Sequence, residues 1–125
     1  MKKILSIFAI ILLAFVLISC GKSASAGTVE IKIYNLEAEE IFDEKVKFSE
    51  EDTLEDLLKE HKKINMKGET LSYGFYITAL AGVSSKNYEN CFWNVKVNGE
   101  DSMVGISMIK LVDGDVLEFH LISFA

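Results

Sequence analysis

Hydrophobic and polar residues alternate most regularly in the last third of the chain. The run Phe92–Val97 alternates toward an Asn98-Gly99 pair, and Val116–Phe124 alternates again after Asp113-Gly114-Asp115. Side chains on a strand point alternately to opposite faces, and Asn-Gly and Asp-Gly pairs favour tight turns. The pattern therefore predicts two strands joined through these turns, and this segment is the clearest scaffold in the sequence.

The same alternation predicts a strand over Thr28–Tyr34 and a second one over Lys45–Phe48. The connection between them, Asn35–Glu44, carries five carboxylates. Calcium takes six to eight oxygen ligands, but the spacing matches no calcium loop, so we expect a solvated acidic loop.

A single helix is predicted over Ser49–Ile64. Its start resembles a capping box, with Thr53 followed three residues later by Asp56. One apolar stripe recurs at helical spacing and is formed by Leu54, Leu57, Leu58, His61 and Ile64. We expect this helix to cover one face of a sheet.

Between the helix and the last third, Asn65–Thr70 reads as a loop with Gly68 at a turn, and Leu71–Val83 reads as a further strand. Six aromatic residues lie close together in and after this strand: Tyr73, Phe75, Tyr76, Tyr88, Phe92 and Trp93. One helix covers only one face of a sheet, so we expect some of these rings on the uncovered face or its rim, as a binding surface.

The element order predicts an α+β domain over residues 28–125. We expect a β-grasp (ubiquitin-like) mixed sheet of four to six strands crossed by one helix. The chain has 13 basic and 19 acidic residues, a formal net charge of −6, which makes nucleic acid a poor partner.

The N-terminus predicts export. Two lysines precede an apolar run that ends in Leu17-Ile18-Ser19-Cys20-Gly21, so residues 1–19 read as a signal peptide with a lipobox. Cys20 would then be lipidated, and 20–27 would tether the domain to a cell membrane, at the cell surface or the periplasmic face. The alternative is an ordinary signal peptide that happens to end at a cysteine.

With Cys20 lipidated, Cys91 has no partner, and we expect it to be a small buried residue in a domain without a disulfide. No pattern brings together a nucleophile, base and orienting group, so we expect neither an enzyme nor a metal site. His61 and His120 are expected to pack rather than to ligate or shuttle protons.

The ordered set of motifs from Tyr73 onward resembles a known domain. It consists of Tyr73-Gly74-x-Tyr76-Ile77-Thr78, Gly82, Phe92-Trp93, Asn98-Gly99, Gly105 and Asp113-Gly114-Asp115-Val116-Leu117-Glu118. This set resembles the C-terminal β-domain of the cobalamin carriers transcobalamin and intrinsic factor, and a bacterial cell-surface family of unknown function that shares it. In the carriers this domain closes over one face of a corrinoid held against an α-helical barrel, which the present chain lacks.

The resemblance implies a ligand edge at the matching positions, namely Tyr73, Gly74, Phe75, Tyr76, Trp93, Met103, Val104 and Gly105. It implies a corrinoid such as cobalamin as candidate ligand, with no cofactor required. The function expected is that of a membrane-anchored lipoprotein that binds a small ligand and passes it to a transporter. The alternative is a protein interaction module that binds another surface protein and no small molecule.

Overall fold

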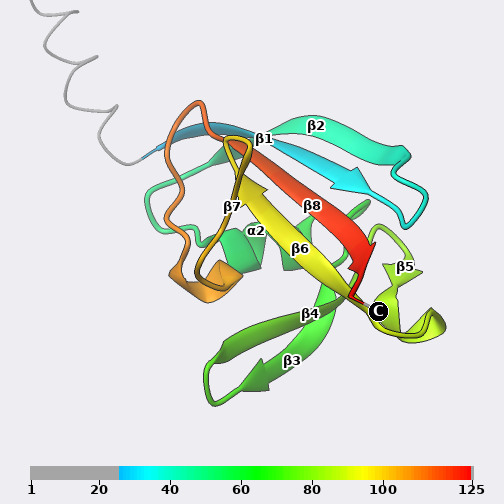
Figure 1. Cartoon of the computed structure of the whole chain (residues 1–125). Coiled ribbons are helices and arrows are strands. Elements are labelled where there is room, and N and C mark those ends of the chain that lie inside the picture. Colours follow the sequence, from blue (N-terminus) through cyan, green and yellow to red (C-terminus); the bar gives the residue numbers. More distant parts are fainter. Residues whose placement is uncertain (1–25, 125) are drawn as a thin grey trace, which may run out of the picture.

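The computed structural model describes residues 26–124 (Figure 1). The strands are β1 Gly27–Tyr34, β2 Glu40–Phe48, β3 Lys67–Leu71, β4 Gly74–Leu80, β5 Val83–Ser84, β6 Cys91–Val97, β7 Glu100–Asp101 and β8 Val116–Ser123. The helices are α2 Leu54–Glu60 and the 3-10 turns η1 Ser85–Asn87 and η2 Ile106–Met108. The predicted signal peptide and Cys20 lie outside the described residues. Among the residues described, no helix is long and apolar enough to cross a membrane.

The main sheet has five strands in the order β2-β1-β8-β6-β7. Only the central pair β1 and β8 is parallel, and the other pairs are antiparallel. The Asn98-Gly99 pair turns β6 into β7 with both residues at positive φ (52° and 84°), as a two-residue hairpin turn requires. The α+β class, the mixed sheet and this turn are confirmed.

A second sheet of three strands, β3-β4-β5, was not expected. The segment Leu71–Val83, predicted as one strand, contains the end of β3, the whole of β4 and the first residue of β5, and β4 pairs with both β3 and β5 in this second sheet. The predicted loop at Asn65–Thr70 is wrong from Lys67 onward. Gly68 lies within β3, where a Cβ would come within 2.6 Å of the Phe75 ring, so close packing rather than a turn calls for glycine.

The helix is shorter than predicted at both ends. Before it, the Asp52 carboxylate accepts hydrogen bonds from the Ser49 amide (2.8 Å) and hydroxyl (3.1 Å), which forms a separate turn. Thr53 is the N-cap, and its hydroxyl accepts from the Asp56 amide at 3.1 Å. His61 ends the helix with an extended backbone. The capping position was therefore predicted correctly, but not the helix length.

The acidic loop is also shorter than predicted, because β2 already begins at Glu40. Alternate residues of β1 and β8 point inward and are fully buried together with the helix side chains Leu54 and Leu58. Figure 1 shows α2 behind the five-stranded sheet, so one face of that sheet is covered and the other is open to solvent. Cys91 is buried and free, as predicted.

Candidate functional site

A cavity of about 320 Å³ lies where the two sheets diverge, between β4 and β6. In Figure 1 these strands approach each other at the Cys91 end of β6 and separate toward η2. We call this cavity the aromatic groove. It is lined by Tyr73, Gly74, Phe75, Tyr76, Ile77, Phe92, Trp93, Asn94, Val95, Ser102, Val104, Gly105, Ile106, Ser107 and Met108. The structure thus brings together every predicted ligand-edge residue except Met103.

The inner wall of the groove belongs to the core. Trp93 is 6% exposed, and its indole N–H donates to the Thr78 carbonyl oxygen at 3.3 Å. The Ser85 hydroxyl donates to the same carbonyl at 3.2 Å. Since Trp93 lies on β6 and Thr78 on β4, the indole bond joins the two sheets where they meet, and the Ser85 bond holds the η1 turn at the same carbonyl. The ring of Trp93 therefore faces the core and forms the back of the groove.

The outer rim is apolar and exposed. Tyr73 and Met108 keep 78% and 70% of their surface in water, whereas Tyr76 keeps 39%. Phe75 is buried on the opposite side of β4 from Tyr76, as alternation requires. Exposed aromatic and methionine side chains gathered around one cavity are typical of a binding edge. Met103 is 94% exposed but does not line the groove.

The two glycines of the predicted site differ. Gly74 has φ +130°, a conformation that side chains disfavour, and a Cβ there would lie 3.7 Å from the Ser107 hydroxyl oxygen. Gly105 has an ordinary φ of −71° and open space around it. The backbone requires glycine at Gly74, while nothing local requires it at Gly105.

The sequence analysis did not identify Ser107 as a site residue, yet Ser107 connects the groove to the helix. Its hydroxyl oxygen accepts from the Phe75 amide at 3.1 Å, and the hydroxyl lies 3.4 Å from a Glu55 carboxylate oxygen. Glu55 also pairs with Lys59 at 2.7 Å, and the Lys59 ammonium lies 4.6 Å from the centre of the Phe75 ring. A serine in an irregular connection gives no periodic signal, so only the fold reveals this position.

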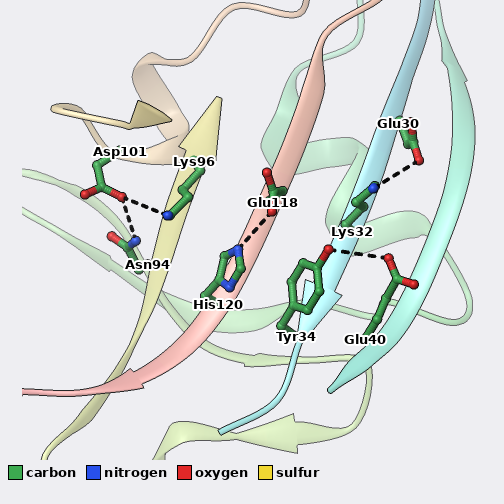
Figure 2. A network of polar contacts seen from close by, with 9 residues as sticks. All are labelled: Glu30, Lys32, Tyr34, Glu40, Asn94, Lys96, Asp101, Glu118 and His120. Atoms are coloured by element: carbon green, nitrogen blue, oxygen red, sulfur yellow. Dashed lines mark hydrogen bonds and ion pairs between the residues drawn. The ribbon is translucent and has the colours of Figure 1, made fainter. Parts of the chain in front are cut away.

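The open face of the main sheet is polar. Figure 2 shows charged and polar side chains of this face paired with one another, both within a strand and between adjacent strands. The rings of Tyr34 and His120 stack 4.4 Å apart, and His120 lies 3.1 Å from Glu118. Asn94 donates to Asp101 at 3.0 Å. Of the six clustered aromatic residues, Tyr73, Tyr76 and Tyr88 are exposed, and only the first two of these line the groove.

Three groups on this face have shifted pKa values. Partial burial raises the pKa of Tyr34, and the nearby Glu40 carboxylate raises it further. The pKa of Lys32 is raised mainly by Tyr34 and then by Glu30. A hydrogen bond with Asp43 raises the pKa of Glu30 above its ordinary value. Apart from the burial of Tyr34, these shifts arise mainly from interactions between side chains of β1 and β2 on the open face, and none of these side chains lines the groove.

The two histidines also lie outside the groove lining. His61 packs edge-on against Phe42 at 5.2 Å between ring centres and lies 3.8 Å from a Glu44 oxygen. His120 lies on the open face. Within residues 26–124, no group of three or more His, Cys, Asp or Glu side chains is arranged to hold a metal ion.

Comparison with known structures agrees with this fold, whereas no curated protein matches the chain. One match is the "putative metal binding protein from Ruminococcus gnavus ATCC 29149" (TM-score 0.62, 18% identity), covering 76% of this chain and 95% of that one. Another is haptocorrin in complex with Cbi (TM-score 0.61, 19% identity), covering 79% of this chain. The chain spans 26% of the haptocorrin length.

At these identities the likeness concerns the fold alone. The predicted resemblance to the transcobalamin-like C-terminal domain is confirmed at that level. The family described as "Domain of unknown function (DUF4430)" matches residues 51–123, which include α2, the aromatic groove and all of β8. The chain belongs to this family.

Proposed function

We propose that the protein is a membrane-anchored lipoprotein whose domain binds a neutral, largely apolar small molecule in the aromatic groove. A corrinoid is the candidate ligand class, and the domain binds it without catalysing a reaction and hands it to a transporter. The observation that carries this proposal is the convergence of two distant segments, Tyr73–Tyr76 and Val104–Met108, on one cavity backed by Trp93.

The chemistry of the lining supports a neutral ligand. In the described part of the chain, none of the residues lining the groove is charged, although 26% of the whole sequence is. Main-chain polar groups are available as well, because β7 pairs with β6 only at Lys96 and Val97. The edge of β6 at Trp93 has no ladder partner on that side among the described residues. Apolar walls with a few polar groups are typical of small-molecule sites.

The size of the groove supports one-sided binding. Ligand pockets usually enclose about 300 to 1,000 Å³, so a cavity of about 320 Å³ covers only part of a large ligand such as a corrinoid. We therefore propose that a second surface covers the opposite side of the ligand.

The fold supports the ligand class. We assign the main sheet to the β-grasp arrangement, because its central strands β1 and β8 are parallel and α2 packs across it. Haptocorrin, whose structure contains Cbi, shares the fold of this chain at a TM-score of 0.61. The ligand of haptocorrin is therefore the natural first probe for the groove.

The test is a titration of the full-length protein, in detergent, with cobinamide. Tyr76→Ala removes a groove ring that is 39% exposed, and Tyr88→Ala removes a ring of equal exposure (40%) that does not line the groove. We expect Tyr76→Ala to weaken binding about tenfold, equivalent to about 1.4 kcal/mol, and Tyr88→Ala to leave it unchanged. Absence of binding up to millimolar cobinamide, or equal loss in both variants, would contradict the proposal.

A second candidate is a protein interaction module, favoured by the exposure of Met103, which lies beside the groove without lining it. Capture of one specific membrane protein by a chain that binds no cobinamide would support this alternative. The anchor is tested separately: Cys20→Ser should release the protein from the membrane fraction, whereas retention there would contradict lipidation at Cys20.

A further inference from the structure

One wall of the aromatic groove is a long connection without strands, Ser102–Val112, which we call the clamp segment. Its regular structure is limited to the three residues of η2. Ile106 is its one fully buried side chain, with Ile109 and Leu111 partly buried. Four of its apolar side chains are exposed, namely Met103, Val104, Met108 and Val112. Segments with few buried contacts open at low free-energy cost.

Empty space lies on both sides of this segment. The aromatic groove of about 320 Å³ lies toward β4 and β6, and a second cavity of about 470 Å³ lies toward the start of α2. Ser107 and Met108 line both cavities. Both cavities are partly open at the surface, so the segment has room to shift without displacing close-packed core side chains.

The hydrogen bonds that hold the clamp segment to the rest of the domain are few. The Ser102 amide donates to the Val95 carbonyl at 2.8 Å, whereas the Met108 and Ile109 amides bond within η2. Between Ser102 and Val112, the described hydrogen bonds to other elements are those of the Ser102 amide and the Ser107 hydroxyl. Among the hydrogen bonds of the described residues, those of the Ser107 hydroxyl are the ones that join the segment to both β4 and α2.

We propose that Ser107 is a latch that holds the clamp segment against β4 and α2, and that release of this latch widens the aromatic groove. In the latched state the Phe75 amide donates a hydrogen bond to the Ser107 hydroxyl oxygen, and Met108 lines the groove. In the released state the segment shifts into the space beside α2. Glu55 is a positioning residue, because it orients the Ser107 hydroxyl without lining the groove.

Hydrogen exchange on the full-length protein in detergent tests the latch without any ligand. Ser107→Ala should accelerate exchange of the Phe75 amide at least tenfold. It should also accelerate the Ser102 and Ile109 amides, whose hydrogen bonds do not involve Ser107. The Asn94 amide, in the β6–β8 ladder, reports global stability and should change less. Ser107→Thr keeps the hydroxyl and should restore slow exchange, and Ser72→Ala, in an exposed turn, is the matched control.

Acceleration confined to Phe75 would overturn the latch, because it would show that Ser107 only satisfies one local amide. Equal acceleration at Asn94 would overturn it too, because the variant would then be globally destabilised. The groove's role as a ligand site rests on the proposed function and is tested separately by association kinetics. If cobinamide binds, Ser107→Ala should raise its association rate several-fold, while Ser72→Ala should not.

Discussion

The open face of the main sheet and the aromatic groove are built from neighbouring residues of the same strand, yet they differ in chemistry. On β6, Asn94 and Lys96 point to the open face, where each lies within 4.0 Å of Asp101. Trp93 points the other way and backs the groove. The open face pairs polar and charged side chains with one another, whereas the groove combines an uncharged lining with exposed apolar side chains.

This difference indicates that the open face contributes to stability and the groove to binding. Polar groups that already satisfy one another gain little by pairing with a partner, since exchanging one hydrogen bond for another changes the free energy little. Exposed apolar surface gains about 25 cal/mol for each Å² removed from water. Binding energy is therefore available at the groove, whereas the paired polar groups of the open face offer little.

The largest effect is expected where the groove meets the core. Trp93→Ala should lower the free energy of unfolding by about 3 to 5 kcal/mol, because it removes a buried ring and a bond between the sheets. Chemical denaturation measures this loss. Phe124→Ala removes a ring that is 65% exposed and should cost far less. Similar losses in the two variants would contradict the assignment of Trp93 to the core.

The next effect distinguishes two methionines of the clamp segment. Met108 lines the groove and Met103 does not, although both are largely exposed. Met108→Asp places a charge against a neutral ligand and should weaken cobinamide binding about tenfold or more, because burial of an unpaired charge is costly. Met103→Asp should have little effect. Calorimetric titration compares the two, and equal weakening would indicate that the apolar rim acts as a whole.

Much of the fold could be predicted because its signals are local. Alternation predicts β1, β6 and β8, and two left-handed residues at Asn98-Gly99 fix the turn after β6. The split into two sheets could not be predicted, because it depends on which strand β4 pairs with, a long-range choice that periodicity does not encode. The helix was overestimated because Asp52 forms its own turn before the N-cap.

The candidate site was predicted in part, and from family resemblance rather than from local sequence patterns. Family resemblance indicated Tyr73–Tyr76, Trp93 and Val104, and the structure places them around one cavity. It did not indicate Ser107 or Met108, because the connection that carries them has no regular pattern. Resemblance also placed Met103 at the ligand edge, whereas the side chain lies outside the groove lining.

A smaller effect is expected on the open face. His120→Ala removes both the stack on Tyr34 and the contact with Glu118. An aromatic pair and a hydrogen bond each contribute about 1 kcal/mol, so the free energy of unfolding should fall by about 1 to 2 kcal/mol. The affinity for cobinamide should stay the same. A marked loss of affinity would show that the open face takes part in binding.

The smallest effect concerns the pH dependence of stability. Glu30 has a pKa above its ordinary value of 4.5, mainly because it shares a hydrogen bond with Asp43. A carboxyl group with a raised folded-state pKa binds its proton more tightly in the folded state, so its ionisation destabilises the fold as the pH rises through that range. Glu30→Gln should therefore stabilise the protein slightly at pH 7 and have no effect at pH 3, where the carboxyl is protonated in both states. Thermal unfolding at the two pH values measures the difference, with Glu100→Gln in β7 as control. A destabilised variant at pH 7 would show that the ion pair of Glu30 with Lys32, 3.8 Å away, outweighs the repulsion from Asp43.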